Sequence, residues 1–345
     1  GACATLVRLR TLRMERRVPV SERNLMPEER RKHDELSRTC FDAGRWSLRL
    51  AESVAGPKEG AGCEESWIAL GDYARGVWLC LAGTHCAPAD ALVREAEWVA
   101  GSDVGAELSD TRRWVLDLIS LAQTVGVRAA KPAGLPPKAI VVSGGAAALD
   151  ETLLPDVRLL LEQVLAGFDG EVISGGTTAG VPGCVGEVAA GLSGRQAKKF
   201  ELIGYLPAEL PHDADRDERY DELIAHGRSG FSPDQILQAW RNLAAKGVVA
   251  SEVLCLGFGG GPLSGAEYRI ALALGATVVT ALGSGGAADA LVEDPVWRDA
   301  DNLMPLAMDT PRLNPGPDHA RRCDGRTVDG FPELLDKVGV NDSRA

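Results

Sequence analysis

Residues 253–267 read Val-Leu-Cys-Leu-Gly-Phe-Gly-Gly-Gly-Pro-Leu-Ser-Gly-Ala-Glu, and this stretch decides the fold class. Its first four residues form a short apolar run, which is typical of a buried strand in a parallel sheet. Three consecutive glycines follow soon after, and Gly265–Gly275 then has the pattern of a helix. A strand, a glycine loop and a helix in this order indicate an α/β protein whose loop lies at the carboxyl end of a parallel strand.

The same order recurs on both sides of this stretch, between residues 138 and 310. The other strand candidates are Ala139–Val142, Glu171–Ile173, Phe200–Leu206, Thr277–Leu282 and Leu303–Met308, and the other helix candidates are Leu153–Ala166, Val185–Leu192 and Pro233–Lys246. Short apolar strands that alternate with helices predict a Rossmann-like parallel sheet with helices on both faces. The predicted fold class is therefore α/β, preceded by a smaller all-α domain.

The predicted all-α domain lies before a proline-rich stretch at residues 129–137. Apolar residues recur there at helical spacing in Glu28–Ala55, Ser66–Leu81, Pro88–Ala100 and Asp110–Val125. Two consecutive prolines, Pro136 and Pro137, cannot continue a helix and favour a domain boundary. We predict a tail over residues 1–26, a helical domain over 27–128, an α/β domain over 138–310 and a tail over 311–345.

Four of the predicted strands are each followed directly by a glycine cluster. Ligands bind where the carboxyl ends of parallel strands converge, and glycine lets backbone N–H groups approach a phosphate near a positive helix N-terminus. The predicted nucleotide-binding residues are Ser143, Gly144, Gly145, Ser174, Gly175, Gly176, Thr177, Thr178, Gly259, Gly260, Gly261, Ser264, Glu267, Gly283, Ser284 and Gly285. The alternative, that these glycines only form tight turns between strands and helices, stays open.

Composition and missing motifs exclude several other functions. The 345 residues carry a net charge of −12, which argues against nucleic-acid binding. The longest apolar stretch, Ile270–Leu282, is too short to span a membrane, and no secretory signal pattern is seen. The eight cysteines form no Cys-x-x-Cys pair and the five histidines form no zinc motif, so we predict a cytoplasmic protein without a metal. The P-loop, dinucleotide and hydrolase-elbow fingerprints are also missing.

Residues 260–267 resemble the Pro-Gly-Gly-x-Gly-Thr-x-x-Glu motif of the LOG phosphoribohydrolases, once called lysine decarboxylases. The matching positions are the paired glycines, the threonine position and the glutamate: Gly260, Gly261, Ser264 and Glu267. Leu263 stands where the motif has its inner glycine. Residues 174–183 are similar to the first glycine loop of the wider SLOG superfamily. Together with the acidic segment at 212–222, this combination is most similar to the TRPM-type SLOG domains of prokaryotes.

The resemblance implies a Rossmann-like nucleotide pocket with one of two functions. TRPM-type domains are thought to sense nucleotide-derived ligands such as relatives of ADP-ribose, often within bacterial conflict systems, and this is the first expectation. LOG members hydrolyse the N-glycosidic bond of nucleoside monophosphates with an arginine and the motif glutamate, which would here be Arg241 and Glu267. Under the first expectation the helical half transmits the signal or forms a homo-oligomer, which is common among LOG-like folds. No cofactor is expected.

For two features, the sequence alone leaves two interpretations open. Glu267 either contacts a ribose or an oxocarbenium-like centre, or only caps the first turn of its own helix. The acidic segment His212–Glu222 forms either a mobile lid over the pocket or a solvated surface loop.

Overall fold

The structure is a computed structural model of the whole chain. It describes residues 67–68, 70–74, 110–125, 136–145, 151–295, 297–307 and 328–329. The chain divides into two compact units, Gly1–Ala129 and Ala130–Ala345. In the first unit, α5 spans Asp110–Val125, the range predicted for a helix, and buries Trp114, Leu118 and Leu121 along one side. The predicted helices at 28–55 and 88–100 lie outside the described residues.

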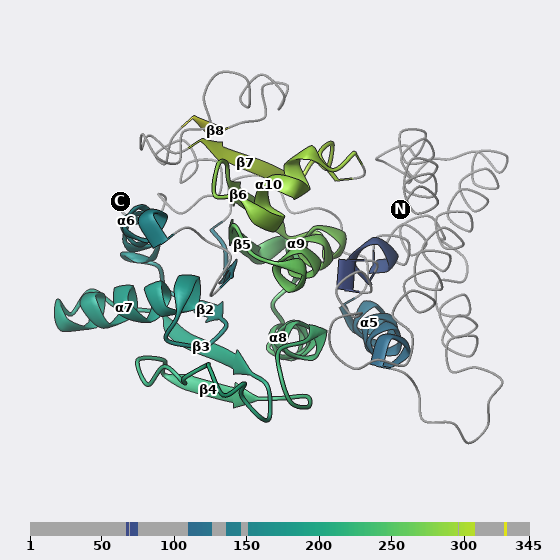
Figure 1. The fold of residues 1–345 in the computed structure, drawn as a ribbon, viewed down its shortest axis with the longest axis horizontal. Helices are drawn as coiled ribbons and strands as arrows, with labels where there is room; N and C mark the ends of the chain where they lie inside the picture. Colours follow the sequence, from purple (N-terminus) through teal and green to yellow (C-terminus); the bar gives the residue numbers. More distant parts are fainter. Residues whose placement is uncertain are drawn as a thin grey trace, which may run out of the picture. The chain divides into compact units, whose positions relative to one another are not determined.

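The second unit is built on one parallel sheet (Figure 1). Its strands are β1 (Ala139–Gly144), β2 (Glu171–Ser174), β3 (Glu201–Leu206), β4 (Glu222–Ala225), β5 (Val253–Phe258), β6 (Thr277–Ala281), β7 (Leu303–Ala307) and β8 (Val328–Asp329). Their order across the sheet is β4-β3-β2-β1-β5-β6-β7-β8, and every pair of neighbours is parallel. The predicted α/β, Rossmann-like sheet is thereby confirmed.

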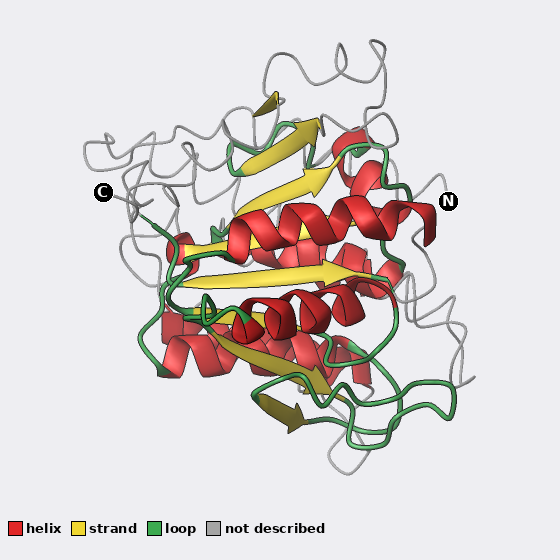
Figure 2. Ribbon diagram, turned by 90° about the vertical axis from the view of Figure 1, so that its left-hand side faces the viewer, coloured by secondary structure: helices red, strands yellow, loops and turns green. Residues whose placement is uncertain are grey.

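Helices cover both faces of this sheet (Figure 2). They are α6 (Leu154–Leu165), α7 (Gly180–Gly194), α8 (Pro233–Ala245), α9 (Pro262–Leu274) and α10 (Gly286–Glu293), with short 3₁₀ turns at Glu151–Leu153 and Ala250–Glu252. α6 and α7 lie on one side, and α8, α9 and α10 lie on the other (Figure 1). The chain changes sides after β4, because the strands grow outward from β1 in one direction up to β4 and in the other from β5 onward.

Alternating side chains of the central strands hold the two layers together. Ile140 and Val142 of β1 belong to one buried cluster with the apolar side chains of α6 and α7. In α6 the buried residues Val157, Leu161 and Val164 recur at a spacing of three or four, so one face of the helix is apolar. The strand β1 is also buried on its other side, as expected for a central strand of a parallel sheet.

Four described elements differ from the predictions. The strand β4 and the strand β8 were not predicted, and α10 was not assigned as a helix. Helix α7 begins at Gly180, five residues before the predicted start, because Pro182 lies within its first turn, where proline is tolerated. In the part of the chain that the structure covers, no helix has the length and hydrophobicity needed to cross a membrane.

The amino-terminal end of α8 has a capping box. The Ser232 hydroxyl accepts a hydrogen bond from the Asp234 N–H at 3.3 Å, and the Gln235 side chain accepts one from the Ser232 N–H at 2.8 Å. We expect Ser232→Ala to lower the free energy of unfolding by about 1 kcal/mol, because one helix N–H loses its partner. Urea unfolding measures this, with Ser193→Ala at an exposed position in the last turn of α7 as the control. Equal losses in the two variants would contradict the cap.

Candidate functional site

The carboxyl ends of β1 and β5 lie side by side at the centre of the sheet. Ser143 of β1 is paired with Gly257 of β5, and Gly144 is paired with Phe258. From β1 the chain runs on to one face through α6, and from β5 it runs on to the other face through α9. The chain therefore leaves these two strands toward opposite faces, which is the arrangement that opens a binding crevice at the switch point of an open α/β sheet. We call the space beyond the carboxyl ends of β1 and β5 the β1/β5 crevice.

The loop after β5 consists of three glycines. They differ in whether the backbone conformation at their position requires a glycine. Gly259 and Gly260 have φ values of 55° and 87°, which glycine adopts without strain. Gly261, by contrast, is extended with a φ of −92°, and a Cβ there would meet no atom of the described residues within 4 Å. Neither the backbone nor the packing requires glycine at this position. Gly261 is also the N-cap of α9, so it lies at the positive end of that helix.

Glu267 lies on α9, a little over one turn beyond this loop. Its side chain keeps some exposure, while its carboxyl group lies near Ser143, Cys255 and Tyr268. Burial raises the pKa of Glu267 to about 7, and the Ser143 hydroxyl opposes this rise by favouring the charged form. A carboxyl group with a pKa near neutrality can give or take a proton at physiological pH.

Tyr268, the next residue on α9, ties the two sides of the crevice together. Its buried hydroxyl is 3.2 Å from the carbonyl oxygen of Ser143 and 3.3 Å from that of Gly259, and it donates to this pair. The ring fits because Gly257 has no side chain: a Cβ there would lie 2.8 Å from the Tyr268 ring. This contact fixes the ends of β1 and β5 relative to α9, and nothing in the sequence pattern pointed to it.

The loop after β6 supports the loop after β5. The N–H groups of Gly283 and Gly285 donate to the two carboxylate oxygens of Asp289, each at 3.0 Å. The Ser284 hydroxyl accepts from the Gly259 N–H at 2.9 Å. Two N–H groups at the start of α10, those of residues 287 and 288, donate to the carbonyl oxygens of Gly260 and Gly259. These donors are thus engaged within the protein, and a side-chain carboxylate occupies the place where an external anion would sit.

The loop after β2 is engaged by the acidic segment 212–222. The Thr178 N–H donates to the Asp215 carbonyl at 3.1 Å, and the Asp217 N–H donates to the Gly176 carbonyl at 3.0 Å. Ser174 at the end of β2 donates its hydroxyl hydrogen to the Val142 carbonyl at 2.8 Å. The predicted residues Gly175 and Thr177 belong to the same loop, where Thr177 is buried. This loop therefore forms the flank of the crevice next to β1.

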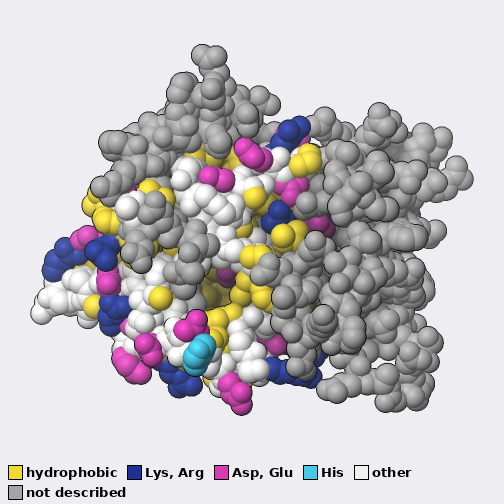
Figure 3. Space-filling model, in the orientation of Figure 1, with side chains coloured by type: hydrophobic (Ala, Val, Ile, Leu, Met, Phe, Trp, Pro, Cys, Tyr) yellow, Lys and Arg dark blue, Asp and Glu magenta, His cyan; other side chains and the backbone are white. Residues whose placement is uncertain are grey.

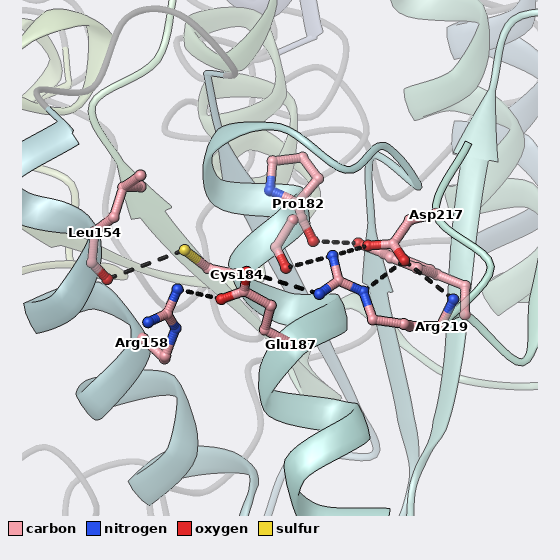
Figure 4. Close-up of polar contacts among 9 residues, drawn as sticks. Leu154, Arg158, Pro182, Cys184, Glu187, Asp217 and Arg219 are labelled. Atoms are coloured by element: carbon pink, nitrogen blue, oxygen red, sulfur yellow. Dashed lines mark hydrogen bonds and ion pairs between the residues drawn. The ribbon is translucent and has the colours of Figure 1, made fainter. Parts of the chain in front are cut away.

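The acidic segment is anchored to α7 rather than standing free in solvent (Figure 4). Asp217 is only 2% exposed and binds the Arg219 side chain through both carboxylate oxygens, each at 2.7 Å. The Tyr220 hydroxyl donates to the Pro182 carbonyl at 2.9 Å. Gly186 of α7 leaves room for Asp217, because a Cβ there would lie 2.3 Å from its carboxylate. The expectation of a wholly solvated loop is met at His212 and Asp213, which are exposed, but not at Asp217.

The remaining predicted residues lie in different places. Ser264 is buried in the first turn of α9, where it packs under Gly260. Gly145 directly follows β1 and is half-buried. Arg241 lies on α8, the helix that packs against both β3 and α9, and its catalytic role stays a prediction. No group of three His, Cys, Asp or Glu side chains suited to a metal occurs among the residues that the structure covers.

Charged side chains of both signs are interspersed on the face of the molecule shown in space-filling form (Figure 3). Hydrophobic side chains gather nearer the centre of that face. Nucleic-acid binders instead concentrate lysine and arginine in one patch or stripe. The described part of this face therefore shows no basic patch or stripe of that kind.

Comparisons with known proteins show a similarity in fold between this chain and several solved structures. No family model and no curated protein matches the chain. Among solved structures, the chain is similar to TM1055, a structural-genomics target, at 19% identity and a TM-score of 0.32, over 45% of this chain and 81% of that one. Two structures of a molybdenum cofactor carrier protein from Chlamydomonas reinhardtii match at 23% and 24% identity, with TM-scores of 0.36 and 0.34, each over 50% of this chain and 90% of theirs.

Fold and site together define a class of protein. The second unit is a Rossmann-like α/β unit whose switch point is lined by glycine loops and by one carboxyl group with a raised pKa.

Proposed function

We propose that the β1/β5 crevice binds a nucleotide-derived ligand and that the protein acts as a sensor of that ligand. One observation carries this proposal: Gly261 is a glycine that neither backbone strain nor packing against the described residues requires, and it lies at the N-terminus of α9, where a Cβ would meet none of those residues. A phosphate is the group that gains most from such a place, since it can accept hydrogen bonds from bare backbone N–H groups at the positive end of a helix.

The position of Glu267 favours a ligand that is larger than a phosphate group alone. It lies 267 − 261 = 6 residues beyond Gly261 in the same helix, roughly 9 Å along the helix axis. A ligand that places a phosphate at the helix N-terminus and also forms a hydrogen bond with Glu267 must therefore carry a second polar group apart from its phosphate. A nucleotide has such a group in its ribose hydroxyls, which a carboxylate binds by accepting their hydrogens.

Replacing Gly261 by alanine tests the phosphate site directly. We expect Gly261→Ala to fold normally, because its φ suits any residue and its Cβ meets no protein atom. We also expect it to weaken nucleotide binding at least tenfold, because the added methyl group enters the path of the phosphate. Isothermal titration calorimetry with AMP, NAD and ADP-ribose measures the affinity. The control is Gly191→Ala in α7, where a Cβ also meets open space. Equal affinities in the two variants would contradict the phosphate site.

A second function, hydrolysis of the N-glycosidic bond of a nucleotide, is favoured by the pKa of Glu267. A carboxyl group with a pKa of about 7 is suited to general acid–base work or to stabilising positive charge at a sugar carbon. Incubation with AMP, NAD and ADP-ribose, followed by chromatography of the free base, separates the two functions. Binding without release of base supports the sensor, whereas base release that is lost in Glu267→Gln supports the hydrolase. Neither binding nor release would contradict both.

The wider setting of this function also stays a proposal. A sensor needs a part that passes the signal on, and residues 27–128, which the sequence predicts to be a helical domain, are the candidate within this chain. We place the protein in the cytoplasm as a homo-oligomer, in keeping with the sequence-based expectation. Size-exclusion chromatography with light scattering, with and without ADP-ribose, tests the oligomeric state.

A further inference from the structure

The side chain of Ser143 is buried at the end of β1 without completing a hydrogen bond. The residue is 4% exposed, and its hydroxyl oxygen has no hydrogen-bond partner among the described residues. Buried hydroxyl groups nearly always have a partner, since leaving one unpaired costs free energy. The unpaired Ser143 hydroxyl is such an exception within a candidate site. The neighbouring residues of α9 explain it.

Two neighbouring residues of α9 meet Ser143 in different ways. Tyr268 holds its backbone, because the tyrosine hydroxyl lies 3.2 Å from the Ser143 carbonyl oxygen. The carboxyl group of Glu267 lies near the side chain of Ser143, because the Ser143 hydroxyl is close enough to stabilise the glutamate carboxylate. The backbone of Ser143 is thus fixed while its hydroxyl group stays free to rotate toward the carboxyl group.

We propose that Ser143 is a positioning residue for Glu267, which orients the carboxyl group of that residue in the β1/β5 crevice by donating a hydrogen bond to it. This inference rests on the proposed function, because orientation matters only for a carboxyl group that meets a ligand. A buried residue at the end of β1 thereby controls the orientation of a carboxyl group on α9. Both the affinity for a ligand and the proton on Glu267 then depend on a hydroxyl group that need not touch the ligand.

The chemical consequence is a change in the titration of Glu267. A hydroxyl that donates to a carboxylate favours the charged form, so its removal raises the pKa. The other titratable groups that interact with Glu267 are Cys255 of β5 and Tyr268 of its own helix. Burial raises the pKa of both groups well above their ordinary values, so neither changes its charge near neutrality. A shift seen near pH 7 therefore belongs to Glu267.

The test follows the pH at which Glu267 titrates in the full chain, taken from the pH dependence of the free energy of unfolding. We expect Ser143→Ala to move this midpoint upward by about half a unit to one unit. Ser143→Thr, which keeps a hydroxyl group, should restore the wild-type midpoint. Ser143→Cys fills the same space with a weak donor and should behave like alanine, which provides a second variant should Ser143→Ala fail to fold.

Two controls separate positioning from a general effect on folding. Ser174→Ala removes a hydroxyl at the end of the adjacent strand β2 that donates to the Val142 carbonyl, and it should leave the midpoint unchanged. In a Glu267→Gln background, Ser143→Ala should cause no shift. An unchanged midpoint in both Ser143→Ala and Ser143→Cys, or a shift that persists without Glu267, would overturn the proposal.

Titration with ADP-ribose distinguishes this inference from the proposed function. If the wild type binds ADP-ribose and Ser143→Ala changes neither affinity nor midpoint, the positioning role fails while the ligand site stands. If the midpoint shifts but AMP, NAD and ADP-ribose all fail to bind, the contact between the two side chains stands while the proposed function fails. If affinity falls several-fold together with an upward shift, both are supported.

Discussion

Glu267→Gln will make the protein more stable at pH 8 than the wild type, by up to about 3 kcal/mol. In the folded protein burial raises the pKa of Glu267 from 4.5 to about 7. Between these values the folded state holds a proton that the unfolded chain has released. The free energy of unfolding of the wild type therefore falls as the pH rises from about 4.5 to 7, and this contribution is constant above the higher value. Glutamine carries no charge at any pH and avoids the loss.

Urea unfolding at pH 5, 6, 7 and 8 checks this prediction. The wild type should lose stability across the series relative to Glu267→Gln, with most of the difference appearing between pH 5 and 7. Glu218→Gln, which changes an exposed carboxyl group in the acidic segment, is the matched control and should follow the wild type. Parallel curves for the wild type and Glu267→Gln would show that Glu267 is not held in a desolvated site.

Asp294→Ala is expected to destabilise the protein by about 3–5 kcal/mol. Asp294 and Arg269 are both nearly fully buried, and the Arg269 Nη2 atom lies 2.9 Å from the Asp294 carboxylate. The arginine also donates to the Gly265 carbonyl at 2.9 Å, so it links the start of α9 to the segment after α10. Alanine at position 294 would leave a buried guanidinium group without its counter-charge.

The double variant Arg269→Met with Asp294→Ala separates the charge from the packing. Removing both charges avoids the unpaired guanidinium group, so the double variant should be more stable than Asp294→Ala alone by at least 1–2 kcal/mol. Chemical denaturation of the wild type and these two variants in parallel measures this. A double variant that is less stable than Asp294→Ala would mean that the aliphatic part of Arg269 packs more strongly than its charge costs.

The α/β class and the central strands could be predicted from the sequence because they depend on local patterns. Val253–Leu256 is apolar throughout and is followed by glycines, and β5 indeed contains it, extending two residues further. The strand β4 shows no such pattern, since Glu222–Ala225 lies at an edge of the sheet and is partly exposed. The start of α7 was missed because Gly180 and Pro182 suggest a loop, although both occur in its first turn.

The candidate site could be predicted only in part, for a physical reason. Strand order could not be read from the sequence, but the carboxyl ends of β1 and β5 do lie side by side, as expected for parallel strands. Which backbone N–H groups remain available depends on side chains that arrive from elsewhere, such as Asp289 at the loop after β6. The contact between Tyr268 and Ser143 spans 125 residues of sequence, so no local pattern encodes it.

The most direct test of the account is a crystal structure of the protein with ADP-ribose. The ligand should lie in the β1/β5 crevice, with its diphosphate against residues 259–261 at the start of α9 and a ribose hydroxyl within hydrogen-bonding distance of Glu267. ADP-ribose bound elsewhere on the protein, with this crevice empty, would contradict the account.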